Sequence, residues 1–172
     1  MDGDSEARSV SGGEPIGPAD EGIDGVEAFE VTTAEHTEDD LAYDHVPSVG
    51  GEHFPVPATC GFYEAEPPPD EFVVHSLEHG AIWIAYSPDL DEAQVAALRD
   101  LASRQAKVIV TPHDGLEAPI VATAWTRQLT LDSVDDPRLQ QFIEQYRDGP
   151  NAPEPGAACE GAGEPAVASS TT

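Results

Sequence analysis

Residues 74–86 read VHSLEHGAIWIAY, a polar segment with two histidines followed directly by an apolar run. The apolar half, residues 81–86, is rich in β-branched and aromatic side chains and predicts a buried strand. Gly80 is typical of the left-handed residue that ends a helix, so residues 75–79 are predicted to form a turn or short helix leading into this strand. Residues 72–74 (FVV) favour a strand instead, so the predicted turn or short helix is limited to residues 75–79.

Two longer amphipathic helices are predicted elsewhere in the chain. In the first, Asp91 or Asp89 can cap a segment with apolar residues at steps of three, which ends near Arg104. The second opens with Asp136 as the cap and Pro137 at the first helical position, where a missing N–H costs nothing. Both segments have one apolar face and should pack on a sheet.

Further strands are predicted at residues 108–110, 120–122 and 128–131, which are short β-prone runs bounded by turn-forming residues or alternating in polarity. The predicted class is therefore α+β: a small mixed or antiparallel sheet with two amphipathic helices packed on it. Residues 43–71 are rich in proline and are predicted to form a long irregular loop, a kind of segment that often carries function.

Composition divides the chain into three parts. Residues 1–24 are rich in Gly, Asp, Glu and Ser and are predicted to be a disordered acidic tail. Residues 25–150 are predicted to be a single α+β domain, since one core suits a chain of 172 residues. Residues 151–172 are predicted to be a flexible carboxyl tail, which a bond through Cys159 would tether.

The charge balance excludes two classes of partner. The chain has 34 acidic residues against 7 basic ones and a formal net charge of -27. Nucleic acids and anionic membrane surfaces bind through Lys and Arg clusters, so neither is expected to bind here. Lys107 is the only lysine, a bias that indicates a halophilic setting in which salt screens the repulsion. The sequence shows neither a secretory leader nor an apolar run of about twenty residues, which predicts a soluble chain.

Cys60 and Cys159 are the only cysteines, and their spacing matches no known metal or redox motif. Two interpretations remain open. In an oxidising compartment they would form a disulfide that fastens the carboxyl tail, with a stabilisation of about 4 to 5 kcal/mol in the chain-entropy model. Otherwise they are two unrelated small apolar residues.

Three of the six histidines fall where a site is expected. His53 lies in a loop beside two glycines, which permit unusual backbone angles and close approach. His75 and His79 are four residues apart, so on a helix their rings rise from adjacent turns and can share an ion. Along one strand they would be about 13 Å apart, too far to do so. The metal hypothesis therefore requires that residues 75–79 be helical.

A site of three histidines, His53, His75 and His79, suits one transition-metal ion, copper or zinc. Glu78 would then be a fourth ligand or would orient a ring. Two alternatives remain open. One is a metal-dependent enzyme, a hydrolase or oxidoreductase, with Glu78 as the general base. The other is a metal-free interaction domain in which the histidines and Glu78 form a buried polar network.

The other histidine patterns carry no predicted chemistry. Residues 75–79 match H-x-x-E-H, the inverse zinc-peptidase motif, but that motif belongs on a long helix and the segment here is short. His113 is predicted to be a turn residue. His36 and His45 have acidic and polar neighbours and are predicted to be solvated.

From about residue 26 to residue 159 the chain resembles a bacterial and archaeal family, domain-of-unknown-function family 3105. The matching segments, which occur in the family's order, are residues 51–55 (GEHFP), 60–63 (CGFY), 75–80 (HSLEHG), 124–125 (AW) and 153–155 (PEP) ahead of Cys159. The resemblance implies that His53, His75, Glu78 and His79 belong to one site and that the two cysteines are a pair. Many proteins of the family that the chain resembles have an amino-terminal membrane anchor and lie on the outer side of the membrane. This chain differs from them at its amino end, so the resemblance leaves its localisation open.

Overall fold

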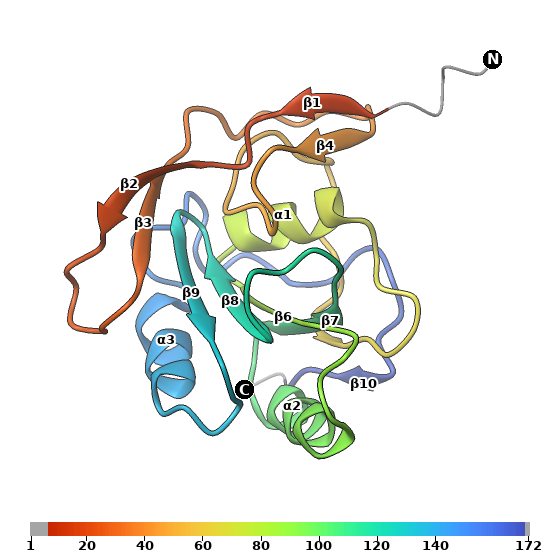
Figure 1. Cartoon of the computed structure of the whole chain (residues 1–172). Helices are drawn as coiled ribbons and strands as arrows, with labels where there is room; N and C mark the ends of the chain where they lie inside the picture. Colours follow the sequence, from red (N-terminus) through yellow and green to blue (C-terminus); the bar gives the residue numbers. More distant parts are fainter. Residues whose placement is uncertain (1–6, 171–172) are drawn as a thin grey trace.

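Strand β6 (Ile82–Tyr86) lies inside an eight-stranded mixed sheet and is buried along its whole length (Figure 1). In this computed structural model, β6 pairs in parallel with β7 (Val108–Pro112) and antiparallel with β8 (Ile120–Ala124). Alternate side chains of β6 enter two separate apolar cores. A strand buried on both faces reads as a continuous apolar run, which explains why residues 81–86 were recognisable in the sequence.

The structure describes residues 7–170. Within them the large sheet has the strand order β10-β5-β7-β6-β8-β9-β3-β2, and β1 pairs with β4 in a separate two-stranded sheet. The helices are α1 (Asp70–Glu78), α2 (Glu92–Arg104) and α3 (Arg138–Tyr146). The remaining strands are β1 (Arg8–Val10), β2 (Glu14–Pro18), β3 (Glu27–Glu30), β4 (Leu41–Tyr43), β5 (Gly61–Phe62), β9 (Arg127–Leu131) and β10 (Val167–Ala168). This arrangement confirms the predicted α+β class with a mixed sheet.

Helices cover both faces of the large sheet (Figure 1). Helices α2 and α3 pack on one face, where Leu98 and Phe142 join a core with Ile84. Helix α1 packs on the other face, where Leu77 joins a second core with Trp83. None of the helices in the described part of the chain has the length and apolar character needed to cross a bilayer.

Helix α2 begins at the predicted cap Asp91, whereas α3 begins at Arg138, one residue later than predicted, with Pro137 at its cap position. The Asp91 carboxylate accepts a hydrogen bond from the backbone N–H of Gln94 at 2.9 Å. The Asp136 carboxylate accepts one from the backbone N–H of Arg138, also at 2.9 Å. Each bond satisfies a donor that the first turn of a helix leaves without a partner, which is why Asp residues mark these starts in the sequence.

Helix α1 is longer than the predicted single turn, because it also includes Val73 and Val74, which favour strands. Both side chains are fully buried in the core beneath the helix. The helix-propensity penalty of a valine is below about 1 kcal/mol, whereas burying its side chain stabilises the fold by about 1.5 kcal/mol or more. Packing against the sheet therefore outweighs the local preference.

The structure differs from the expectation that residues 1–24 form a disordered tail. Strand β1 pairs in parallel with β4, and β2 pairs antiparallel with β3 at the edge of the large sheet. The segment has few apolar side chains to bury, but backbone hydrogen bonds hold it, and composition does not reveal those. Residues 1–6 of the expected tail lie outside the described residues.

The carboxyl segment is joined to the domain at two places. Cys60 and Cys159 form a disulfide with a Cα–Cα distance of 5.5 Å, so the paired interpretation of the cysteines is confirmed. Further along, β10 extends the sheet by pairing with β5. Residues 151–170, expected to be flexible, thus have two fixed points, and residues 171–172 lie outside the described residues.

The disulfide should contribute strongly to stability, because it closes a long loop in the unfolded chain. We expect the double variant Cys60→Ser/Cys159→Ser to lose about 4 kcal/mol of unfolding free energy. A urea titration of both proteins measures the loss, and high salt should be present in both samples to screen the acidic surface. An unchanged midpoint and slope would show that the bond does not stabilise the fold.

Candidate metal centre

Helix α1 presents three of the predicted site residues at its carboxyl end. His75 and Glu78 lie in its last turn and are both buried, and His79 is the residue that caps the helix. Gly80 then takes a positive φ of 98°, and a side chain there would collide with Asp148. The helix can end at this point only with glycine, because no other residue combines that backbone angle with so little space.

His53 reaches the same region from a loop that the amino-terminal segment holds in place. Gly51 has a φ of 109°, and a Cβ there would lie 2.7 Å from the carbonyl oxygen of Ser11. The Arg8 guanidinium donates hydrogen bonds to both carboxylate oxygens of Glu52, at 3.0 and 2.7 Å. A segment expected to be disordered therefore fixes the backbone on which the fully buried His53 ring depends.

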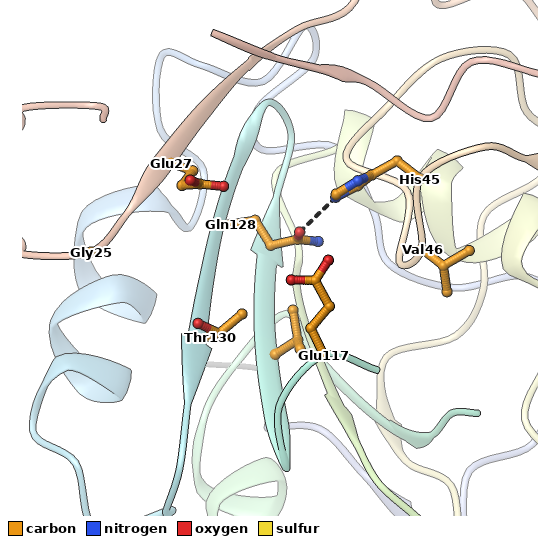
Figure 2. A pocket seen from close by; sticks show the side chains of 8 residues that line it. Gly25, Glu27, His45, Val46, Glu117, Gln128 and Thr130 are labelled. Carbon is orange, nitrogen blue, oxygen red and sulfur yellow. Dashed lines mark hydrogen bonds between the residues drawn. The ribbon is translucent and has the colours of Figure 1, made fainter. Parts of the chain in front are cut away.

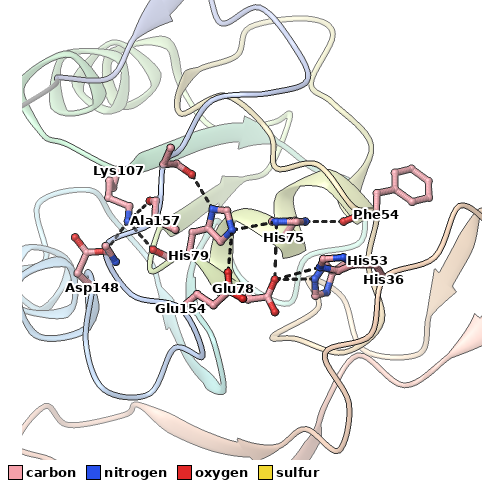
Figure 3. Close-up of polar contacts among 12 residues, drawn as sticks. His36, His53, Phe54, His75, Glu78, His79, Lys107, Asp148, Glu154 and Ala157 are labelled. Carbon is pink, nitrogen blue, oxygen red and sulfur yellow. Dashed lines mark hydrogen bonds and ion pairs between the residues drawn. The ribbon is translucent and has the colours of Figure 1, made fainter.

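One carboxylate oxygen lies at the centre of a histidine cluster (Figure 3). Glu78 Oε1 is 3.0 Å from Nε2 of His53, 3.6 Å from Nε2 of His36 and 3.8 Å from Nε2 of His75. In this group each residue offers one ligand atom, and all four atoms lie within 4.8 Å of one another. Since metal–nitrogen and metal–oxygen bonds are about 2.0 to 2.2 Å, atoms spaced in this way can surround a single ion.

The orientation of the rings decides where their hydrogens are. Nδ1 lies 2.7 Å from the Gly51 carbonyl oxygen in His53, 2.6 Å from that of Phe54 in His75 and 2.7 Å from that of Ala158 in His79. A carbonyl oxygen only accepts, so each Nδ1 donates its hydrogen and each neutral ring has a free lone pair on Nε2. Histidines that bind metals are usually held by this kind of hydrogen bond.

These lone pairs point at other electron-rich atoms. Nε2 of His53 faces the Glu78 carboxylate, and the Nε2 atoms of His75 and His79 lie 3.0 Å apart. Electron pairs at these distances repel one another in a buried site, where water does not screen them. A cation between them, either a proton or a metal ion, turns the repulsion into attraction.

The pKa of His75 favours a metal ion over a proton. Burial lowers this pKa, and the neighbouring His53 and His79 lower it further; the hydrogen bond to Phe54 and the charge of Glu78 act in the opposite direction but do not restore it. Burial therefore disfavours the protonated form of the His75 ring. A neutral imidazole is the form that coordinates a metal.

His36 is the cluster residue that the sequence did not predict. Its side chain is 48% exposed, as its polar neighbours suggested, but its ring stacks on that of His75 with centroids 4.9 Å apart. A short backbone bridge positions it: His53 N–H donates to the Glu35 carbonyl, and Thr37 N–H donates to the His53 carbonyl. No sequence pattern around residue 36 predicts this pairing, because His36 and His53 form an isolated bridge and both lie outside regular strands.

His79 lies at the edge of a second group. Glu78, His79 and Glu154 also offer ligand atoms within 4.8 Å of one another. Of the three predicted ligands, His53 and His75 therefore share one group with Glu78, and His79 belongs to the adjoining group. Neither Glu154 nor His36 was predicted to be a ligand, although residues 153–155 (PEP) are among the segments that resemble the family.

The only lysine of the chain joins helix α1 to the carboxyl segment (Figure 3). Lys107 Nζ donates to the carbonyl oxygens of His79 at 2.5 Å and Ala157 at 2.8 Å, and it pairs with Asp148 at 2.5 Å. A positive charge at a helix carboxyl end is favourable because the last carbonyls carry a partial negative charge. This ammonium thus positions both sides of the second group.

The remaining histidines lie outside the cluster. His113 Nε2 is 2.9 Å from the Asp70 carboxylate at the start of α1. Burial lowers the pKa of His113, but the hydrogen bond and charge of Asp70 raise it, and the net shift is upward. This is the behaviour of an ion pair that fastens α1 to the end of β7, and His113 is therefore more than the predicted turn residue.

A polar pocket of about 190 Å³ beside β8 and β9 is a weaker candidate site (Figure 2). His45, predicted to be solvated, lines it and donates from Nε2 to the Gln128 side-chain oxygen at 2.7 Å. The Gln128 amide donates in turn to Pro47 and Thr123. His45 and Gln128 thus bond to protein groups and not to the space of the pocket.

Fold and site together define an α+β protein with a largely buried histidine–glutamate cluster whose atoms are spaced closely enough to hold a metal ion. Residues 35–161 match the family described as "Protein of unknown function (DUF3105)", and the chain belongs to this family. Neither the curated proteins nor the solved structures contain a significant match to it. The family assignment confirms the resemblance noted in the sequence and covers every residue of both groups.

Removal of the Lys107 ammonium should loosen the carboxyl segment. We expect Lys107→Met, which keeps most of the unbranched side chain but removes the ammonium, to lower the unfolding free energy by about 1.5 to 3 kcal/mol through the lost charged hydrogen bonds. Amide exchange at Glu154, whose N–H donates to the Glu78 carbonyl at 2.9 Å, should become faster.

Arg104→Met is the matched control, because it also removes one positive charge but from an exposed pair with Asp100 on the surface of α2. Such surface pairs contribute little, so its stability should hardly change. Equal losses of stability in the two variants would mean that net charge, and not the position of Lys107, is responsible.

Proposed function

We propose that the protein binds one transition-metal ion, copper or zinc, through His36, His53, His75 and Glu78. The observation that carries this proposal is the orientation of the buried rings. The carbonyls of Gly51 and Phe54 accept hydrogen bonds from Nδ1 of His53 and His75, so the Nε2 atom of each ring turns toward Glu78. Protein folding rarely leaves lone pairs facing a buried carboxylate unless a cation completes the site.

The donor set supports the choice of metal. Three imidazole nitrogens and one carboxylate oxygen suit zinc, which prefers four ligands of these types, and imidazole is also a good ligand for copper. This set keeps the predicted number of histidines but uses His36 where the sequence indicated His79. His79 remains beside the site, with its Nε2 3.0 Å from that of His75.

The position of Glu78 favours metal binding over the catalytic alternative. Its side chain is only 6% exposed, and the same oxygen contacts three ring nitrogens. A carboxylate engaged in this way is a ligand and is poorly placed to take a proton from a substrate. Because His36 is half exposed, an ion or an exchanging ligand could reach the metal site from the side of the cluster where His36 lies.

The disulfide supports an oxidising environment outside the cytoplasm as the place where the protein works. The formal charge of -27 supports a setting with high salt, in which counterions screen the repulsion between carboxylates. An acidic surface also concentrates cations near the protein, which would favour delivery of a metal ion to the site.

The proposal predicts metal in the purified protein. Elemental analysis should find at least about one copper or zinc ion per chain, and the double variant His53→Gln/His75→Gln should contain about one ion fewer. His45→Gln is the control, since it also removes a partly buried histidine but one that is bonded to Gln128. Equal metal content in all three proteins would eliminate the proposal.

Because His53 and His75 are buried, their loss could disturb the fold, and circular dichroism should accompany the metal analysis. His36→Gln gives an independent test, because its side chain is half exposed and its removal should leave the fold intact. Its metal affinity should fall at least about 10-fold, since even residues that only orient ligands have effects of this size. An unchanged affinity would remove His36 from the ligand set.

Metal affinity should also depend on pH. Protons compete with the metal for Nε2, so binding weakens as the pH falls. Because burial holds the pKa of His75 below its usual value of about 6.5, we expect its release of metal to occur below that pH. A competition titration with a metal indicator between about pH 5 and 8 measures this, and constant affinity over that range would contradict histidine ligation.

A further inference from the structure

Two possible ligand residues, His79 and Glu154, lie outside the group proposed to hold the first ion. His36 and His53 group with His75 and Glu78, whereas His79 and Glu154 group with Glu78, and only Glu78 belongs to both groups. We propose that Glu78, His79 and Glu154 form a second cation position, so that the complete centre holds two ions with Glu78 between them. This inference rests on the proposed metal binding at the first position.

His79 is prepared as a ligand in the same way as the histidines of the first position. Its Nδ1 donates to the Ala158 carbonyl at 2.7 Å, so its neutral ring has a free lone pair on Nε2. That Nε2 lies 3.0 Å from Nε2 of His75 and 3.5 Å from the Glu154 carboxylate. An ion at the first position alone would leave the Glu154 carboxylate and Nε2 of His79 facing each other without a metal ion between them.

The chain holds Glu154 in place although its side chain is 61% exposed. Its backbone N–H donates to the Glu78 carbonyl at 2.9 Å, which ties it directly to the end of α1. Pro153 and Pro155 lie on either side of it, and proline restricts both its own backbone and that of the residue before it. These constraints fix the backbone of Glu154, and its solvent-exposed carboxylate lies 3.5 Å from Nε2 of His79.

The donors indicate which cation would occupy this position. One imidazole nitrogen and two carboxylate oxygens form a harder set than three imidazoles, and such sets suit divalent zinc or manganese better than monovalent copper. In known two-metal sites the ions lie about 3.5 to 4 Å apart, a separation that one carboxylate can span. Because it is more exposed and has fewer nitrogen ligands, the second position should bind more weakly than the first.

The second position is assembled by segments distant in the sequence. Helix α1 supplies Glu78 and His79, and the carboxyl segment supplies Glu154. The Lys107 ammonium joins the end of α1 to Asp148 and Ala157, which lie on either side of Glu154. The Cys60–Cys159 disulfide fastens the carboxyl segment a little further along the chain. The carboxyl segment is thus a structural part of the centre, which explains why it is fastened so firmly despite its small apolar content.

The test is the number of zinc ions bound by the full chain. Chelator-stripped protein, titrated with Zn²⁺ in about 1 M KCl to displace loosely held surface cations, should bind about two ions in two steps. Glu154→Ala should bind about one, with the tighter step unchanged. Glu160→Ala is the matched control, because Glu160 is an exposed acidic residue of the same segment, and it should still bind about two.

Each outcome has a distinct meaning. If the wild-type chain binds one ion and Glu154→Ala also binds one, the second position is wrong and the proposed metal binding stands. If Glu154→Ala still binds two ions, the second ion lies elsewhere and the assignment is overturned. If the wild-type chain binds none, the proposed function itself fails. Loading with Cu²⁺ gives a second readout, since two adjacent ions broaden each other's paramagnetic resonance and the signal should sharpen in Glu154→Ala.

Discussion

The site depends on the hydrogen bonds that three backbone carbonyls accept from histidine Nδ1 atoms. Gly51, Phe54 and Ala158 accept these bonds, and each one turns a ring so that its Nε2 points inward. The first two carbonyls belong to the loop between β4 and β5, and the third belongs to the carboxyl segment. The fold must therefore place irregular backbone at three defined points around the end of one short helix, and the rest of the structure can be understood from this requirement.

The sheet supplies the rigid support for that arrangement. Helix α1 is held on one face by its buried valines and Leu77, and Gly80 ends it against the carboxyl segment. The amino-terminal segment fixes the loop of His53, and Lys107 with the disulfide fixes the carboxyl segment. Both ends of the chain thus contribute to the centre, although both have the composition of disordered tails.

Much of the fold could be predicted from local sequence. The caps Asp91 and Asp136 and the apolar run of β6 are signals that act over a few residues, and the structure agrees with them. The full length of α1 could not be predicted, because Val73 and Val74 prefer strands and only burial against the sheet makes them helical. The terminal strands were also missed, because backbone pairing leaves no trace in composition.

By itself the sequence determined the spacing of His75, Glu78 and His79 on one helical turn, since a step of four residues is a property of the helix. It also indicated His53, because the neighbouring glycines mark a backbone with unusual angles. Only the tertiary structure decided that His36 and Glu154 approach these residues. Their contacts cross loops and join segments distant in the chain, and no local pattern records a contact that is made only when the whole chain has folded.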